Sequence, residues 1–396
     1  MTDQENDLSA TRLPAPLPSP LPWYARPAAR AWTCAAPSPD ARAFHASLPG
    51  YASTALHELP LLAAELAVGR VFVKDESSRF GLPAFKALGA SWAIDRILAR
   101  DAHRAPGPGG ARTLRFVTAT DGNHGRAVAR MARQLGRRAH VFVPDGVHPA
   151  AVAAIEGEGA EVTAVAGSYD AAVRDARAAA AAPDAVLVQD MARDGYEEIP
   201  ALVVEGYATL FAEVDAQLEA AGAESPALVA VPVGVGSFAQ AAVTHYRSRA
   251  TVGLRSGATA GLRSGHGMET ALLAVEPVGA ACVLASLRAG RFTRVPAGVT
   301  AMAGLNCGTP SSLAWPVLRD GLDAAVAVTD AESTSAVRDL AELGVSAGPC
   351  GAASLAGVRA ALTGTGGAER RAALGVGPDA TVVLISTEGA AANPGL

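Results

Sequence analysis

The feature that most constrains the fold is a regular alternation of short apolar runs and helical stretches that begins near residue 54. The expected strands cover 70–74, 114–119, 139–144, 161–165, 185–189, 227–232, 271–276, 324–328 and 380–386. Helices are expected between them at 84–100, 125–135, 149–158, 169–182, 198–221 and 238–247. Strand–helix alternation with short connections is typical of parallel sheets covered by helices on both faces. We therefore expect an α/β protein with parallel or mostly parallel sheets flanked by helices.

Two segments stand outside this alternation. Residues 1–40 are rich in proline and alanine and are expected to form an extended or loosely ordered N-terminal extension. Residues 251–268 contain the sequence Gly-Leu-Arg-Ser-Gly twice, at 253–257 and 261–265. Two copies are too few for a repeat fold, so we expect an exposed, mobile insertion loop there.

Composition excludes several classes of protein. The formal net charge is −5 and basic residues are not clustered, which argues against a nucleic-acid partner. The first residues lack the basic and apolar regions of a secretory signal, so we expect none, and we expect no membrane span because no apolar stretch is long enough. The cysteines are scattered and are expected to be free thiols in a reducing cytoplasm, and no His/Cys cluster has metal-ligand spacing. We expect a cytoplasmic protein with no metal site, no nucleic-acid partner and no membrane partner.

Lysine is rare in this chain, since only Lys74 and Lys86 stand among its 33 basic residues. Arginine stays protonated, whereas a desolvated lysine amine loses its proton and forms Schiff bases. Lys86 falls in the first turn of an expected helix, where the helix dipole lowers the pKa of the amine. Lys74 precedes two acidic residues and is interpreted as an ion-paired strand residue. Lys86 is therefore the candidate for covalent chemistry, with a chance survivor of codon bias as the alternative.

The segment Thr118-Ala-Thr-Asp-Gly-Asn-His-Gly125 lies between an expected strand and helix. Ligands of parallel sheets bind outside the carboxyl ends of the strands, which is where this turn lies. Backbone amides at a helix start favour a carboxylate, so Asp121, Gly122, Asn123 and His124 are candidate substrate residues. The alternative is an ordinary turn, because Asp and Asn are common cap residues.

Two more strand ends carry candidate residues. Gly234, Val235, Gly236 and Ser237 form a glycine turn whose backbone amides and hydroxyl suit an anion. This turn lacks the third glycine of a dinucleotide fingerprint and the Gly-Lys-Ser/Thr of a P-loop, so a monophosphate fits it better. The last strand ends in Leu384-Ile-Ser-Thr-Glu-Gly389, which places the hydroxyls of Ser386 and Thr387 at the same edge. By itself this end is also consistent with an ordinary turn.

Together these segments resemble the fold-type II pyridoxal-phosphate (PLP) enzymes, over roughly residues 50–390. Ala84-Phe-Lys86 is similar to the segment that carries the Schiff-base lysine, and the turn around Asn123 to the loop that holds the ring and the substrate carboxylate. Residues 234–237 are similar to the phosphate loop. The resemblance implies bound PLP, with Ser386 or Thr387 at the pyridine nitrogen, and a homodimer. We expect a large PLP-binding domain of 41–90 plus 195–396 and a small domain of 91–194.

Within this group the chain resembles the diaminopropionate ammonia-lyase family. The likeness is carried by 74–86, by 119–126 with Asp121 where serine- and threonine-specific relatives usually place a serine, and by 189–200 with Asp190. It implies α,β-elimination of 2,3-diaminopropionate to pyruvate and ammonia through aminoacrylate. Asp121 and Asp190 then remove the Cα proton or pair with the distal ammonium. The chain departs from the family's pattern at 347–352 and 390–394.

Three other functions remain as alternatives, and the sequence does not choose between D- and L-substrates. A serine or threonine dehydratase or a β-replacement synthase has the same fold, but Asp121 argues against it. A binding protein without catalytic activity is disfavoured by Lys86 and the phosphate loop. A dinucleotide dehydrogenase is disfavoured by the missing glycine pattern.

Overall fold

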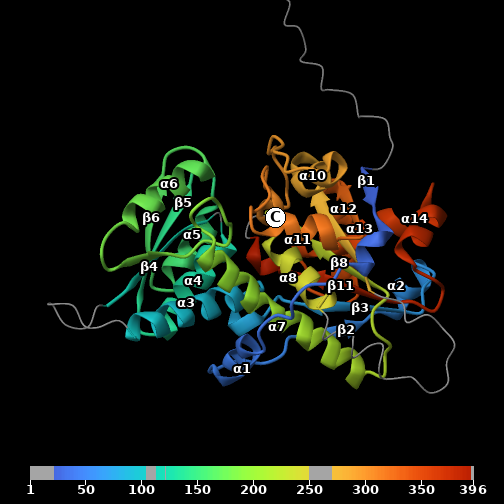
Figure 1. Ribbon diagram of the computed structural model, residues 1–396, viewed down its shortest axis with the longest axis horizontal. Coiled ribbons are helices and arrows are strands. Elements are labelled where there is room, and N and C mark those ends of the chain that lie inside the picture. Colours follow the sequence, from blue (N-terminus) through green and yellow to red (C-terminus); the bar gives the residue numbers. More distant parts are fainter. Residues whose placement is uncertain (1–21, 104–112, 121, 249–269, 394–396) are drawn as a thin grey trace, which may run out of the picture.

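The computed structural model describes residues 22–103, 113–120, 122–248 and 270–393 and contains two separate sheets (Figure 1). A seven-stranded sheet has the order β1-β10-β9-β8-β11-β3-β2, and a four-stranded sheet has the order β6-β5-β4-β7. The strands of the first are β1 Trp23–Ala25, β2 Leu56–Glu58, β3 Arg70–Asp75, β8 Leu228–Pro232, β9 Ala271–Pro277, β10 Ala324–Val328 and β11 Thr381–Ser386. Those of the second are β4 Arg115–Ala119, β5 Arg138–Pro144, β6 Glu161–Val165 and β7 Ala185–Leu187.

In the seven-stranded sheet the five inner strands are parallel and only the edge strands are antiparallel. The inner strands are short runs of Val, Leu, Ala and Ile, and β8 to β11 are buried along their whole length. Such continuous apolar strands are typical of a parallel sheet with both faces covered. The predicted fold class, parallel sheets flanked by helices, is therefore confirmed.

The edge strand β1 shows how the part of the N-terminal extension that the structure describes is held. Trp23 to Ala25 pair with β10, and the Arg30 guanidinium donates to Asp323 at 2.7 Å. An unpaired sheet edge gains hydrogen bonds from an extended chain beside it. Of the two expected forms, extended or loosely ordered, residues 23–25 therefore have the extended one. Residues 1–21 and the expected insertion loop at 251–268 lie outside the described residues.

Helices cover both sheets. Around the four-stranded sheet lie α4 Asn123–Gln134, α5 Pro149–Glu156 and α6 Tyr169–Ala179. All four strands of this sheet fall inside the segment 91–194 that the sequence assigns to a small domain. The remaining helices are α1 Asp40–Ser47, α2 Pro60–Glu65, α3 Ala87–Ala102, α7 Glu198–Ala220, α8 Ser237–Tyr246, α10 Cys282–Ala289, α11 Ala314–Gly321, α12 Asp330–Glu342, α13 Pro349–Leu362 and α14 Gly367–Leu374. Short 3₁₀ helices cover Pro27–Ala31, Arg79–Gly81, Val278–Ala280, Ala303–Leu305 and Ala390–Ala392.

Helices α3 and α7 pack closely against each other in the lower part of the view, where α3 also packs on α4 and α7 on α8 (Figure 1). Their contact uses glycine on both sides. A Cβ on Gly206 would lie 2.5 Å from the Leu88 carbonyl oxygen and 2.8 Å from the Cα of Gly89. Only glycine allows so close an approach of two backbones.

Helix α3 begins at Ala87 and not at 84 as the sequence predicts. Residues before it pair with the chain that follows β11, since Ala84 forms a bridge with Glu388 and the Phe85 amide donates to the Thr387 carbonyl at 3.2 Å. These bonds tie residues 84 and 85 to the chain after β11, and the helix begins only after them. Lys86 therefore occupies the N-cap position of α3.

Candidate active site

A cavity of about 1450 Å³ lies between the two sheets. Each of the strand-end segments singled out in the sequence contributes to its wall, through Lys86, Asn123, Gly234 and Thr387. These residues follow β3, β4, β8 and β11, so the carboxyl ends of strands from both sheets open into one space. This is where parallel α/β proteins bind their ligands.

The Lys86 amine contacts the carboxylate of Asp190. Its Nζ lies 2.5 Å from Asp190 Oδ2, and the two side chains are 21% and 13% exposed. Burial raises the pKa of Asp190, but the charge of Lys86 and the hydrogen bond from its amine outweigh burial and hold that pKa below its ordinary value. Asp190 is therefore ionised at neutral pH and lies directly beside the only amine in the cavity wall among the described residues. Such a pairing of perturbed groups in a cleft is typical of catalytic sites.

His124 lies on the other side of the same carboxylate. Its Nε2 lies 2.9 Å from the Val188 carbonyl oxygen, which only accepts, so Nε2 carries the proton. Burial lowers the pKa of His124, although Asp190 raises it. The ring is neutral, and Nδ1 is an acceptor 3.8 Å from Asp190 Oδ2 that has no hydrogen-bond partner in the described part of the chain.

Asn123 begins α4, and its side chain reaches across to the other sheet. The amide Nδ2 donates to Glu388 Oε2 at 2.7 Å. Glu388 is 3% exposed and follows β11. The sequence analysis did not single out Glu388, although it belongs to the Ser-Thr-Glu-Gly segment that contains two predicted residues. Asn123 thus connects the two sheets at the cavity.

The predicted phosphate loop forms a concave backbone turn at the start of α8. Gly236 has φ of 95°, a left-handed conformation that favours glycine. The first hydrogen bond of the helix runs from the Gln240 amide to the Gly236 carbonyl oxygen. The amides just before Gln240 lie at the start of the helix and have no acceptor within it, an arrangement that favours an anion. A Cβ on Gly234 would lie 3.0 Å from the Gly304 carbonyl oxygen. A side chain at position 234 would therefore crowd the turn, whereas glycine leaves it open. A monophosphate such as that of PLP fits this loop.

The hydroxyl of Ser237 is used differently from the prediction. It donates to the Asp190 carbonyl oxygen at 2.6 Å and so connects the phosphate loop to the segment after β7. The backbone amide of Ser237 remains at the helix start. The Val235 carbonyl accepts from the Ser311 amide at 2.7 Å, which fixes the turn from outside.

Of the two hydroxyls at the end of β11, Thr387 lines the cavity and Ser386 does not. Ser386 Oγ donates to the Glu388 carbonyl oxygen at 3.3 Å and is fully buried. The geometry therefore favours Thr387 for a contact with a ring nitrogen. Asp121 lies outside the described residues.

Tyr207 is a second cavity residue that the sequence analysis missed. It lies inside α7 and packs on the rings of Phe85 and Phe238, at centroid distances of 4.8 and 5.7 Å. Its hydroxyl is buried without a hydrogen-bond partner among the described residues, and burial raises its pKa. Nothing in the local sequence separates it from an ordinary core aromatic residue of a long helix.

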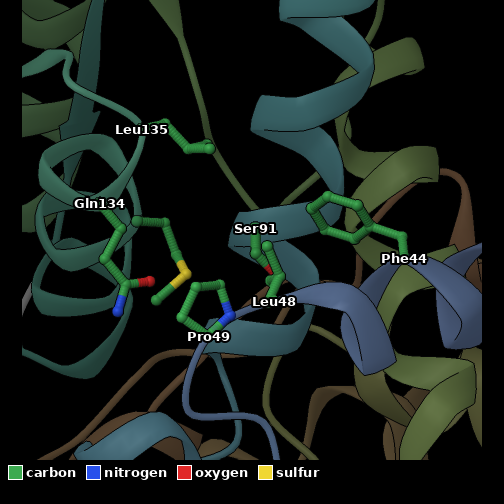
Figure 2. Close-up of a pocket in the computed structure, with 7 residues that line it drawn as sticks. Phe44, Leu48, Pro49, Ser91, Gln134 and Leu135 are labelled. Atoms are coloured by element: carbon green, nitrogen blue, oxygen red, sulfur yellow. The ribbon is translucent and has the colours of Figure 1, made fainter.

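A smaller cavity of about 300 Å³ lies away from these residues, between α1, α3 and α4 (Figure 2). It is lined mostly by apolar side chains, including Phe44, Leu48 and Leu135. Ser91 is the hydroxyl in its wall, and this group already donates to the Leu88 carbonyl oxygen. This cavity contains no ionisable group and none of the predicted residues.

The fold and the larger cavity define a class of protein. The family described as "Pyridoxal-phosphate dependent enzyme" matches residues 48–388, and the chain is a PLP-dependent enzyme of that family. The chain is also 36% identical to diaminopropionate ammonia-lyase of Salmonella typhimurium, over 75% of this chain and 73% of that protein. It is 33% identical to diaminopropionate ammonia-lyase of Escherichia coli K12, over 88% and 87%. Within the PLP-dependent enzymes, the chain belongs to the diaminopropionate ammonia-lyase family.

A solved structure gives the same answer. The Escherichia coli diaminopropionate ammonia-lyase in complex with an aminoacrylate–PLP azomethine reaction intermediate superposes with a TM-score of 0.79. It is 31% identical and covers 94% of each chain. The predicted family and cofactor are therefore confirmed.

Proposed function

We propose that the protein eliminates ammonia from 2,3-diaminopropionate, which gives aminoacrylate and then, by hydrolysis, pyruvate and a second ammonia. The observation that carries the proposal is the contact between the Lys86 amine and the ionised, buried Asp190. The relatives of 33–36% identity are named for this reaction, and one was captured with an aminoacrylate intermediate.

The residues of the cavity fit the cofactor. Lys86 would hold PLP covalently, the 234–237 turn its phosphate, and Thr387 its ring nitrogen. PLP, when bound, withdraws electrons from the Cα–H bond of the substrate. Thr387 is a neutral hydrogen-bond partner, which would leave the ring nitrogen unprotonated and favour loss of a β-substituent over transamination.

Asp190 supplies a carboxylate where the reaction needs one. The elimination breaks the Cα–H and Cβ–N bonds and forms a carbon–carbon double bond, and the nitrogen leaves as ammonia if it is protonated. An ionised carboxylate either accepts the Cα proton or holds the distal ammonium in its protonated form. We infer that Asp190 and Asp121 divide these roles, with Asp121 removing the proton from a D-substrate.

The direct test is a product assay. Pyruvate and ammonia are measured with D- and L-diaminopropionate, serine and threonine. We expect diaminopropionate to be the preferred substrate and to release two ammonia molecules for each pyruvate. Preference for serine or threonine would instead support a dehydratase on the same fold.

The role of Asp121 is tested with the two isomers. We expect Asp121→Asn to lose more activity on D- than on L-diaminopropionate, since it would lack the base on one face of the substrate. Equal losses on both isomers would reject the assignment of Asp121 to one face.

The setting of the enzyme is also a proposal. We propose a cytoplasmic homodimer on the basis of the family resemblance and of four cysteines that are all free thiols. No helix in the described ranges is long and apolar enough to cross a membrane. Light scattering on the purified protein would test the dimer, and a monomeric mass would contradict it.

A further inference from the structure

The Glu388 carboxylate joins three separate parts of the chain. Its Oε2 accepts from Asn123 Nδ2 at 2.7 Å, and its Oε1 accepts from Asn393 Nδ2 at 2.7 Å and from the Cys350 amide at 3.2 Å. Glu388 itself is 3% exposed and lines the cavity. Within the described ranges it has no lysine or arginine partner, so neutral donors alone hold the carboxylate.

A carboxylate accepts hydrogen bonds and donates none, which fixes the direction of the Asn123 amide. The NH₂ group must face Glu388, and a flipped amide would oppose two oxygens. The second N–H and the Oδ1 of Asn123 are then left for a ligand of the cavity. Without Glu388 both amide orientations would be similar in energy, and each would present different groups to the ligand.

Two segments that are distant in sequence meet at this carboxylate. Cys350 lies in the first turn of α13 and Asn393 follows the short helix Ala390–Ala392. Both donate to the same oxygen, Oε1, whereas Asn123 donates to Oε2. The Glu388 side chain is therefore held from one side and is able to hold Asn123 on the other.

We infer that Glu388 is a positioning residue that orients Asn123 for the cofactor ring and the substrate carboxylate. It does so across the two sheets, because Glu388 follows β11 and Asn123 follows β4. The inference rests on the proposed function where the substrate is concerned. For the cofactor it stands independently of which amino acid is consumed.

The test is a double-mutant cycle with PLP itself as the probe. In Glu388→Gln one carboxylate oxygen becomes an NH₂ group, which faces a donor such as the Asn123 amide and does not accept from it. A lost hydrogen bond to a charged group costs about tenfold or more in binding. We expect PLP affinity of the full-length protein, measured by fluorescence titration, to fall about tenfold and KM for diaminopropionate to rise. In an Asn123→Ala background the same change should have almost no effect.

The cycle separates positioning from a merely structural role. A loss of PLP affinity that is equally large with Asn123→Ala, or no loss in either background, would overturn the inference. Asn393→Ala removes one neutral donor and leaves the carboxylate, so it provides a milder second cycle if Glu388→Gln does not fold. Its smaller loss of affinity should also vanish with Asn123→Ala, and an additive loss would count against positioning.

The matched control is Glu342→Gln, an exposed carboxyl at the end of α12. It removes the same charge without touching the cavity and should leave PLP affinity unchanged. If diaminopropionate were not the substrate, the wild type would show no turnover with it, while the PLP titrations would still measure the coupling of positions 123 and 388.

Discussion

The two lysines of the chain, Lys74 and Lys86, lie close in sequence and occupy opposite environments. Lys74 is fully buried and bonded to Glu213 Oε2 at 2.7 Å, the Thr54 carbonyl at 2.9 Å and Gln217 Oε1 at 2.8 Å. The side chain of Lys86 is 21% exposed and faces a cavity. A buried amine with all its donors used has a structural role, whereas an amine beside an open space is able to exchange partners.

The carboxylates of the two pairs differ in the same way. Glu213 also accepts two hydrogen bonds from Arg79, each at 2.8 Å, and Arg79 in turn pairs with Glu76. Asp190 is paired with Lys86, and within the described residues the neutral His124 lies on its other side. The network around Lys74 therefore has several buried charges that compensate one another, whereas the pair of Lys86 and Asp190 lies in the wall of an open cavity.

The largest expected effect is that of Lys86→Ala. Activity should fall by about ten-thousandfold or more, because no other residue replaces a covalent amine. Borohydride trapping followed by mass spectrometry should locate the pyridoxyl adduct at position 86 in the wild type and find none in the variant. Lys74→Arg is the control and should retain the adduct. An adduct at position 74, or normal turnover without Lys86, would contradict the comparison of the two lysines.

Lys74→Met should destabilise the fold and leave the adduct at Lys86 intact. Removing one partner of a buried ion pair typically costs 3–5 kcal/mol, and about 3 kcal/mol is expected here because Arg79 still compensates Glu213. The free energy of unfolding is measured with denaturant. Unchanged stability would show that the network around Lys74 is not what holds this part of the sheet.

Asp190→Asn should lower kcat/KM about a hundredfold on diaminopropionate while stability changes little. The change keeps the shape of the side chain and removes the charge that contacts Lys86. Rates with both isomers and a denaturation curve are the measurements. A loss of stability with full activity would place Asp190 with Glu213 as a structural carboxylate.

Glu276 is a buried carboxyl group that accepts hydrogen bonds from backbone amides, and its pKa contrasts with that of Asp190 beside Lys86. Burial raises its pKa to about 8, although the Val283 and Leu284 amides donate to it at 2.8 and 2.7 Å and lower the pKa. The folded state then binds a proton that the unfolded state has lost, so stability falls as the pH rises from about 4.5 towards 8.

The corresponding variant is Glu276→Gln. Between pH 6 and 7 the wild type should lose about 1 kcal/mol more of its free energy of unfolding than this variant. Denaturation curves at the two pH values provide the measurement. Parallel pH profiles would mean that Glu276 is ionised throughout, unlike its predicted state.

Most of the fold could be predicted because parallel strands buried on both faces have a strong local pattern. The expected strand at 161–165 matches β6 in both bounds, and the expected helix at 198–221 differs from α7 by one residue. The edge strands β1 and β2 were not predicted. Each has three residues and no alternation, and their pairing depends on the neighbouring strand and not on their own sequence.

Site residues that belong to a local motif could be predicted from the sequence. Contacts that form only when distant segments come together in the fold could not. The wall of the cavity contains Lys86, Asn123 and the 234–237 turn, although their roles remain predictions. The contact of Lys86 with Asp190 spans 104 residues, and that of Asn123 with Glu388 spans 265. No local pattern encodes such distant pairs, and the hydroxyl of Ser237 was assigned to an anion because its long-range acceptor was invisible in the sequence.

The glycine contact between α3 and α7 has a consequence for how this enzyme tolerates change. Lys86 caps one of these helices, and Tyr207 adjoins Gly206 in the other. A single added methyl at Gly206 would have to separate the two backbones, and the reactive amine would move together with its helix. Substitution is thus restricted at Gly206, which does not line the cavity. A screen for inactivating mutations should find this position although it lies outside the active site.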